Sequence, residues 1–471
     1  MTGRRTTMWT FVVVSVAVFM ASLDNLIVTT ALPLIKTELG ASLQGLQWTV
    51  NAYTLTFAVL LLTGAALGDR FGRKRMFLAG ITIFTAGSAL AALAPSIELL
   101  IVARAVQGMG GAIVTPLTLT ILSAAVPPAR RGLALGVWSG VGCLAIAIAP
   151  VVGGAVVESF SWQWIFWLNV PIGLALLPIA WLRVEESTGP NRTLDIPGLV
   201  LASTGLFGLV WGLVRSDSQG WTSLGVAGPM AAGAMLVALF VWWEARSRSP
   251  MVPMRFFRQR AFSAANLTSM LMSFGLFGSV FLLAQFFQIV QQYSPLQAGL
   301  RTLPWTAMPI LVAPLAGLLS DRIGSRPLLV SGMALMAGGL AWIAAVASPT
   351  VPYVAFIPPF AIAGIGMSLF FAPVANVVLS AVRRDEEGKA SGVNNTIREV
   401  GGVFGVAVLA SIFASVGGYT SPSTFTEGLN AALWVGAVVV GLGTIAALGI
   451  PGRKVVALRP PALPMTAEEH A

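Results

Sequence analysis

Charged residues are scarce in this sequence, and their scarcity excludes most classes of soluble protein. Asp, Glu, Lys and Arg together make up 10% of the 471 residues, whereas soluble domains usually carry about 25%. Hydrophobic residues make up 56% of the chain, and the mean hydropathy is +0.83. We therefore expect most of the protein surface to face lipid and not water.

Histidine and cysteine are almost absent. The single histidine, His470, lies at the end of the chain, so histidine supplies no proton relay within the apolar segments. The single cysteine, Cys143, excludes a disulfide within the chain, and its apolar neighbours predict a packing role. The apolar segments hold no cluster of His, Asp or Glu, which argues against an enzyme embedded in the membrane.

Long apolar runs dominate the sequence instead. A helix needs about 20 mostly apolar residues to cross a bilayer core, and fourteen such runs occur between charged or Pro/Gly-rich breaks. They predict an all-α polytopic membrane protein, because the strands of a membrane barrel would show short alternating segments. Fourteen is even, so we expect both termini on one side. The runs lie near residues 9–31, 46–68, 77–94, 99–125, 133–157, 163–182, 195–214, 222–243, 262–290, 300–320, 328–347, 353–381, 399–417 and 429–450.

Positive charge is distributed unevenly over the predicted loops. All but four of the 28 Lys and Arg residues lie in one set of alternate loops. The exceptions are Lys36, Arg215 and Arg301 in the opposite set, and Arg104 within a run. Because cytoplasmic loops accumulate Lys and Arg, we predict that both termini are cytoplasmic. The net charge of +10 then reflects topology, and no nucleic-acid partner is expected.

Two loops repeat each other. The sequence "GDRFGRKRM" (68–76) follows span 2 and "SDRIGSRPL" (320–328) follows span 10, so that Asp, Arg and Gly recur with a displacement of 252 residues. A second pair, "LSAAVPPARRGLALG" (122–136) and "LSAVRRDEEGKASG" (379–392), repeats two glycines with a displacement of 256. Two matches at nearly one offset indicate a duplicated unit.

The offset covers eight spans and predicts two six-span halves separated by two additional spans. Paired six-span halves are typical of transporters that rock around a site at the membrane midplane. The predicted division is an N-terminal half (1–183), a linker with two extra spans (184–260), a C-terminal half (261–452) and a tail (453–471).

Several motifs together resemble the major facilitator superfamily, and within it the fourteen-span drug:proton antiporter family. The loop "GDRFGRKR" is similar to the superfamily's signature between spans 2 and 3. Four further stretches resemble motifs of spans 4, 5, 1 and 6: "RAVQGMGGA" (104–112), "AIAIAPVVGG" (145–154), "LDNLIVTTALP" (23–33) and "SWQWIFWLNVPIG" (161–173). Ala145 and Ala149 stand where the span-5 motif usually has glycine, and they keep these positions small.

The resemblance implies a fold of two pseudo-symmetric six-helix bundles plus two extra helices, and a monomer in the plasma membrane. It also implies export of hydrophobic or cationic drugs, including antibiotics, driven by a proton gradient and without a cofactor. Two alternatives stay open: a dedicated exporter of an endogenous metabolite or lipid, and, less favoured, an uptake symporter.

Asp24 is the only carboxylate that these boundaries place deep inside a span. A charge at the bilayer centre costs at least about 2.5–3.5 kcal/mol, so such residues usually serve a function. We predict that Asp24 exchanges a proton for a cationic substrate; the alternative is an Asp that only hydrogen-bonds to neighbouring helices. Arg104 cannot deprotonate, so we predict that it acts through an acid on another helix. Candidate polar groups of a transport cavity are Asn51, Gln107, Gln285, Gln288 and Asn376.

The resemblance implies two further sites. In the first, a cytoplasmic gate, Asp69 bonds to the start of span 13, just after Asn394 and Asn395. In the second, small residues of span 5 form a seam that seals against proton leak. The predicted gate residues are Gly68, Asp69, Arg70, Gly72, Arg73, Asp321, Arg322 and Gly324. The predicted seam residues are Ala145, Ala149, Pro150, Gly153 and Gly154.

Overall fold

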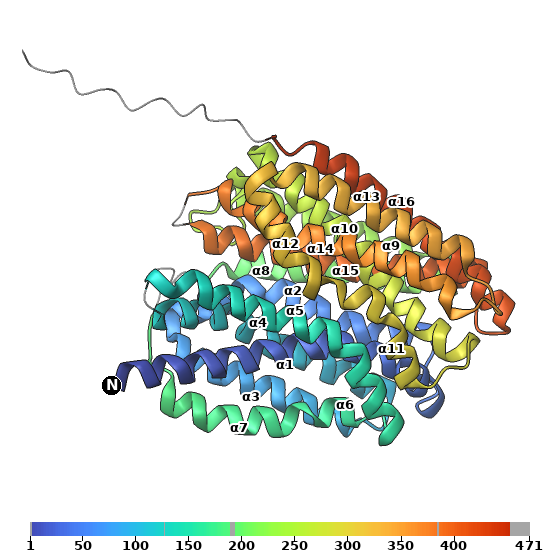
Figure 1. Cartoon of the computed structure of the whole chain (residues 1–471), viewed down its shortest axis with the longest axis horizontal. Coiled ribbons are helices and arrows are strands. Elements are labelled where there is room, and N and C mark those ends of the chain that lie inside the picture. Colours follow the sequence, from blue (N-terminus) through green and yellow to red (C-terminus); the bar gives the residue numbers. More distant parts are fainter. Residues whose placement is uncertain (1, 127, 189–193, 384–385, 453–471) are drawn as a thin grey trace, which may run out of the picture.

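The computed structural model describes residues 2–126, 128–188, 194–383 and 386–452. These residues form helices and connecting loops, and fourteen of the helical segments are long and apolar enough to cross a membrane. Figure 1 shows the helices running side by side along one direction. The α-helices are α1 (Thr2–Glu38), α2 (Leu43–Phe71), α3 (Arg73–Ala92), α4 (Ile97–Ala125), α5 (Pro128–Ser159), α6 (Trp164–Trp167), α7 (Asn169–Arg183), α8 (Ile196–Gln219), α9 (Leu224–Arg246), α10 (Arg260–Gln285), α11 (Pro295–Thr306), α12 (Met308–Ile323), α13 (Ser325–Val346), α14 (Ile357–Ser380), α15 (Glu387–Val416) and α16 (Pro422–Leu448). Short 3₁₀ or π turns cover Met254–Arg258, Phe286–Val290 and Tyr353–Phe356.

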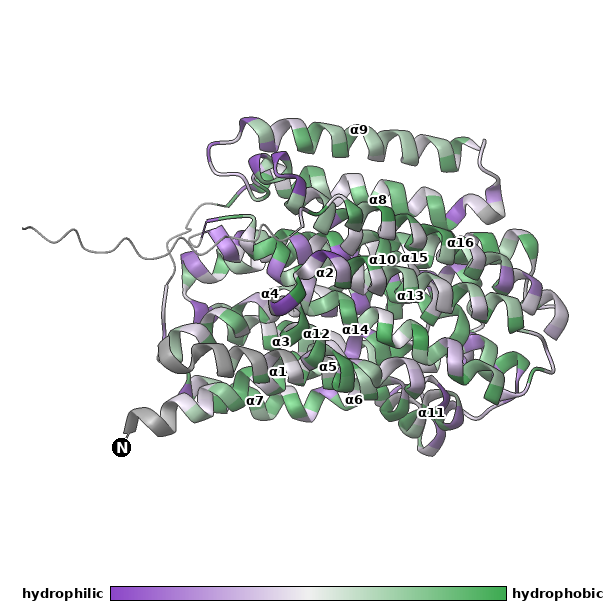
Figure 2. Ribbon diagram, turned by 45° about the horizontal axis from the view of Figure 1, so that its top comes forward, coloured by the Kyte–Doolittle hydropathy of each residue, from purple (hydrophilic) through white to green (hydrophobic). Residues whose placement is uncertain are grey.

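The helices gather into two bundles. Helices α1 to α7 form the lower bundle of Figure 1, and α10 to α16 form the other, which occupies the upper part of the view except for α11. Helix α11 contacts α14 of its own bundle and reaches down to pack against α5. Helix α8 packs against α9 and also against α2 and α15, one helix from each bundle, whereas α9 lies at the edge of the molecule (Figure 2). Helix α7 ends at Arg183 and α10 begins at Arg260, near the predicted borders at 183 and 260. The division into halves, linker and tail stays a prediction, and the tail 453–471 lies outside the described residues.

The two predicted repeat loops have the same backbone structure. Gly72 ends α2 with φ +103°, and its N–H donates to the Gly68 carbonyl over 3.0 Å. Gly324 ends α12 with φ +87°, and its N–H donates to the Ser320 carbonyl over 3.0 Å. Only glycine adopts such positive φ angles without strain, so each loop requires glycine at this position to turn the chain directly into the next helix.

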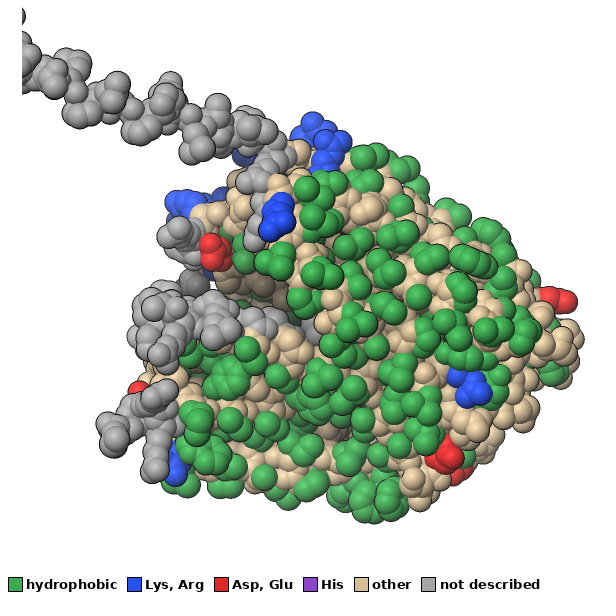
Figure 3. All heavy atoms as spheres, in the orientation of Figure 1, with side chains coloured by type: hydrophobic (Ala, Val, Ile, Leu, Met, Phe, Trp, Pro, Cys, Tyr) green, Lys and Arg blue, Asp and Glu red, His purple; other side chains and the backbone are tan. Residues whose placement is uncertain are grey.

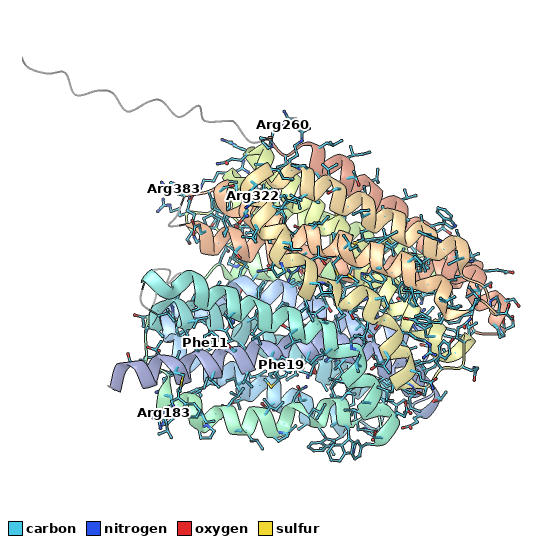
Figure 4. All side chains as sticks on the ribbon, viewed as in Figure 1. Phe11, Phe19, Arg183, Arg260, Arg322 and Arg383 are labelled. Atoms are coloured by element: carbon cyan, nitrogen blue, oxygen red, sulfur yellow. The ribbon has the colours of Figure 1, made fainter. Side chains whose placement is uncertain are left out.

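The surface has the distribution expected of a membrane protein. Figure 3 shows apolar side chains over the middle of one face, with charged side chains toward its edges. In Figure 4, Arg183, Arg322 and Arg383 lie toward the same end. We call this the basic end, defined by the loops after α2, α7, α12 and α14, and the opposite end the far end.

Eleven of the predicted spans agree with the helices to within about five residues. The prediction ends span 1 near residue 31, whereas α1 continues to Glu38, and it begins spans 13 and 14 too late. Helix α15 starts at Glu387 and not near residue 399, and α16 starts at Pro422 and not near residue 429. The first turns of α15 are polar. Lys389 and Asn395 in these turns line a cavity and do not face lipid, so these positions do not require apolar side chains. Asn394 and Asn395 therefore lie within the helix, and the prediction that they precede it was wrong.

Candidate functional site

Asp24 and Arg104 form an ion pair in the interior of the N-terminal bundle. Arg104 Nη1 donates to Asp24 Oδ2 over 2.5 Å, and the two side chains are 0% exposed. The sequence predicted that the partner of Arg104 comes from another helix, and this is confirmed, because Asp24 lies on α1 and Arg104 on α4. Tyr53 of α2 covers the guanidinium, with its ring centroid 4.4 Å from Cζ.

A hydrogen-bond network surrounds this pair. Asp24 Oδ1 accepts from Gln107 Nε2 and from Asn169 Nδ2, each over 2.7 Å. Gln107 also accepts from Arg104 (2.7 Å) and donates to Ser88 Oγ (2.7 Å). Each oxygen of the Asp24 carboxylate therefore accepts from at least one buried side chain. The network joins α1, α3, α4 and α7.

Breaking such a pair is costly. Removing one partner of a buried ion pair typically destabilises a protein by about 3–5 kcal/mol, because the other charge stays buried without compensation. The structure thus makes Asp24 and Arg104 one unit, and their predicted role in proton coupling stays a prediction.

An apolar pocket lies toward the far end, between the two bundles. It has a volume of about 40 Å³, and since a buried water needs roughly 10–15 Å³ of such volume, the pocket in this conformation admits only a few waters. Gln288 of the C-terminal bundle lines it and donates to the carbonyl of Thr30 on α1 over 3.0 Å. Other residues that line the pocket include Leu26, Pro150 and Trp305.

A second, polar cavity lies at the basic end. Its volume is about 230 Å³, close to the roughly 300 Å³ at which small-molecule sites begin. It is lined by both bundles and by the linker, through residues 61–69 of α2, 115–120 of α4, 249–251 and 388–395 of α15. Figure 3 shows the hollow between the two lobes at the left of the view.

The other predicted cavity residues lie elsewhere. Asn51 is fully buried and lines neither the apolar pocket nor the polar cavity. Gln285 is also buried, and its Oε1 accepts from the hydroxyl of Tyr419 over 2.5 Å. Burial raises the pKa of Tyr419, so its hydroxyl stays protonated and remains a donor. Asn376 is exposed and donates to Ser320 Oγ over 3.3 Å.

Asp69 lines the polar cavity, across from the first turns of α15. Its carboxylate accepts two hydrogen bonds from Arg73, from Nε over 3.1 Å and from Nη2 over 2.9 Å. The predicted bond from Asp69 to the start of α15 is not among the hydrogen bonds of the described residues, since the cavity separates the two. Instead, Glu186 accepts from the backbone N–H groups of Lys74 and Arg75 at the start of α3.

The remaining gate residues lie close to this cavity or at the equivalent place in the other bundle. Gly68 faces Leu117 so closely that a Cβ would come within 2.2 Å of its Cδ2. Arg70 extends over the ring of Phe71 (5.1 Å). Arg322 and Gly324 end α12, while the side chain of Asp321 lies outside the described part. Their role as a gate stays a prediction.

The predicted seam on α5 packs directly against the other bundle. A Cβ on Gly154 would lie 2.3 Å from the Pro295 carbonyl oxygen, and one on Gly299 would lie 2.2 Å from the Pro150 oxygen. Thr306 of α11 donates to the carbonyl of Ala147 over 3.0 Å. Three further seam residues share this interior side of α5: Ala145 and Ala149 are fully buried, and Gly153 contacts Ile27 and Thr30 of α1. The far end is therefore closed by backbone contact.

Comparison with known proteins agrees with this architecture. The family model of the Major Facilitator Superfamily matches residues 14–406 and, in a second match, 262–464. The chain belongs to this superfamily. It is 34% identical to the tetracenomycin C resistance and export protein of Streptomyces glaucescens over 428 residues, which cover 90% of this chain and 79% of the relative.

The chain is also similar to a second curated protein and to a solved structure. The chain is 35% identical to the multidrug resistance protein Stp of Mycobacterium tuberculosis H37Rv, over 87% of this chain and 76% of that protein. Among solved structures, the inward open xylose transporter XylE from E. coli aligns with a TM-score of 0.65 and 14% identity, over 96% of this chain and 98% of that one. This last similarity shows the fold.

Some residues at the site of this superfamily member were not predicted from the sequence. Glu399 lies twelve residues inside α15 and is 3% exposed, so the prediction that Asp24 is the only carboxylate deep inside a span was wrong. The late predicted start of span 13 placed Glu399 at its border. Asn169 was not recognised as a partner of Asp24, although it lies within the quoted span-6 motif. Glu158 at the end of α5 was not singled out from the sequence.

Proposed function

We propose that this chain is a proton-coupled secondary transporter that exports hydrophobic or cationic small molecules, drugs or antibiotics, across the plasma membrane. The observation that carries the proposal is the position of the two spaces between the bundles. The polar cavity lies at the basic end, whereas backbone contacts across Gly154 and Gly299 close the far end. Access from one end at a time is what alternating access requires.

The direction of transport follows from two supports. Both relatives named above are export or resistance proteins by name. Because cytoplasmic loops accumulate Lys and Arg, we propose that the basic end faces the cytoplasm, so that the polar cavity receives substrate from inside the cell. We further propose that the protein acts as a monomer and needs no cofactor, because a proton gradient supplies the energy.

Proton coupling is assigned to the Asp24–Arg104 pair in this proposal. Protonation of Asp24 would remove its charge and weaken its hold on Arg104 and Asn169, which lie on α4 and α7. A change of charge at one buried point can thus alter the packing between helices of the same bundle. The roles of Asp69 and of the equivalent loop at Arg322 as gate elements belong to the same proposal.

A dedicated exporter of one endogenous metabolite or lipid is the second candidate function. The observation that favours it is the relative from Streptomyces glaucescens, whose name contains a single compound, tetracenomycin C. An uptake symporter is less favoured, because the small-residue seam on α5 resembles the antiporter motif. A screen of structurally unrelated substrates separates a multidrug exporter from a dedicated one.

Transport into liposomes tests the proposed function. Wild type and Asp24→Asn are reconstituted, and a pH gradient drives the movement of a fluorescent lipophilic cation. We expect transport by wild type and none by Asp24→Asn, because asparagine cannot titrate. Equal transport by both proteins would move proton coupling away from Asp24. Failure of wild type to move the cation, or any compound of the substrate screen, would contradict export as proposed.

A further inference from the structure

Two buried carboxylates lie inside the membrane-spanning helices of the two bundles, and their surroundings differ. Both oxygens of Asp24 are occupied by three donors, among them Arg104 at 2.5 Å. Glu399 is 3% exposed, yet its Oε2 has no hydrogen-bond partner. Its other oxygen accepts only from the adjacent Arg398, over a long 3.3 Å. An unpartnered carboxylate oxygen in a buried place is costly, which points to a ligand.

Glu399 lies on the side of α15 that borders the polar cavity. Gly388, Gly392 and Asn395 line that cavity, and Glu399 follows them at spacings of eleven, seven and four residues. Residues at these spacings lie on one face of a helix. Glu399 is thus the next residue on this face of α15, one turn beyond Asn395, the last residue of the face that lines the cavity.

The face of α2 that borders the same cavity also leads to a polar group without a hydrogen-bond partner. Leu62 and Asp69 line the cavity, and Leu55 and Asn51 continue the same face toward the far end at helical spacing. Asn51 is 0% exposed, and neither its Oδ1 nor its Nδ2 has a hydrogen-bond partner. On both α2 and α15, the face that lines the cavity therefore continues to a buried polar group without a hydrogen-bond partner.

The register of the two helices brings these groups to nearly the same level. Gly392 packs against Leu62, since a Cβ on Gly392 would lie 2.5 Å from Leu62 Cδ2. Helices α2 and α15 are antiparallel, because one is an even and the other an odd span. Seven residues further on each helix, about 10 Å at a rise of 1.5 Å per residue, Glu399 lies opposite Leu55. Asn51 is one turn beyond.

We propose that Glu399 binds the cationic group of the substrate, with Asn51 as a polar neighbour from the other bundle. The inference rests on the proposed function, and it names the substrate class of a site between α2 and α15, just beyond the lining of the polar cavity. This class is organic monocations with a delocalised or shielded charge. Such a cation can leave water at low cost and can pair with a carboxylate where no strongly hydrated ion would enter. Arg398, 30% exposed, neutralises one oxygen of Glu399 and leaves the other for the ligand.

The position between the bundles couples this site to transport. Glu399 belongs to the C-terminal bundle and Asn51 to the N-terminal one, so rocking of the bundles would separate them. Asn51 shares α2 with Tyr53, whose ring lies 4.4 Å from the Arg104 guanidinium.

Equilibrium binding of tetraphenylphosphonium to the full chain in detergent tests the proposal. We expect Glu399→Gln, which keeps the shape and removes the charge, to raise Kd at least about tenfold, and Glu399→Asp to raise it less. Glu387→Gln, the same change at the start of the same helix, is the matched control and should change Kd less than twofold. An unchanged Kd in Glu399→Gln would overturn the proposal.

A second measurement covers the case in which Glu399→Gln does not fold. In a Cys143→Ser background, Glu399→Cys is labelled with a cationic thiol reagent. We expect tetraphenylphosphonium to slow the labelling, and no protection would overturn the proposal. If wild type binds no tetraphenylphosphonium, the cation site is refuted, while transport of a neutral compound would still support export. If it binds the cation but a pH gradient moves no compound, the proposed function fails and the site stands.

Discussion

Glu158 at the end of α5 accepts a 2.6 Å hydrogen bond from the hydroxyl of Ser294, which precedes α11 in the other bundle. The same carboxylate oxygen accepts from the backbone N–H of Leu296 over 3.0 Å. Glu158 thus caps a helix of the opposite bundle, at the end where the positive pole of the helix dipole lies. Nearby, Lys36 Nζ of α1 lies 2.9 Å from the ring centroid of Tyr419. The far end is held by polar contacts around the glycine seam.

Glu158→Gln should weaken closure of the far end. A charge at a helix N-terminus contributes about 0.3–1 kcal/mol, so we expect the population with an open far end to rise roughly two- to fivefold. The measurement is the rate at which Thr302→Cys, in the apolar pocket, reacts with an impermeant maleimide in a Cys143→Ser background. Glu427→Gln, an exposed carboxylate of α16, is the control. Equal rates in both variants would show that Glu158 does not hold the closed state.

Gly154→Ala should disturb the same closure by steric overlap. Its Cβ would lie 2.3 Å from the Pro295 carbonyl oxygen, whereas a Cβ on Gly140 of the same helix meets nothing within 4 Å. Overpacking of this kind costs about 1–3 kcal/mol. We expect Gly154→Ala to lower the melting temperature in detergent and to speed labelling of Thr302→Cys, while Gly140→Ala changes neither. If Gly154→Ala changes neither the melting temperature nor the labelling rate, α5 and α11 are not in tight contact.

Arg104→Gln should destabilise the protein, and removal of both charges should cost less than the sum of the two single changes. The single change leaves Asp24 buried without its cation, at a cost of about 3–5 kcal/mol. In Asp24→Asn/Arg104→Gln no buried charge remains, so its loss should be smaller than the sum of the two single losses by about 0.5–3 kcal/mol. Unfolding of all four proteins under one denaturant gives this difference. Strict additivity would mean that the two side chains do not interact.

Much of the fold could be predicted from the sequence, because crossing a bilayer imposes a length and a composition on each helix. The apolar runs predicted fourteen spans, and fourteen helices of that kind are observed. The prediction failed where the residues of a helix face a cavity and not lipid. The first three turns of α15 line a cavity, carry Lys389 and Asn395, and so lack the apolar signal on which the border at 399 depended.

The candidate site was predicted in parts. The sequence identified Asp24 and Arg104 as unusual, since one charge in an apolar run is visible without any structure. Their distance of 2.5 Å and the partners Gln107 and Asn169 depend on how four helices pack, and no local pattern encodes that. Asn51 and Gln285 were predicted to line a cavity because they are polar side chains within spans. Both are buried and line neither cavity.

The sequence by itself determined the membrane class, the number of spans and the duplication of the loops at Gly72 and Gly324, because hydropathy and glycine requirements act on short stretches of chain. Tertiary structure alone decided which end is closed and that Glu399 keeps an oxygen without a partner. Those properties arise from contacts between residues more than 80 positions apart, such as Glu158 with Ser294. Packing sets such contacts, and it left Glu399 with an oxygen that no residue of the described chain fills.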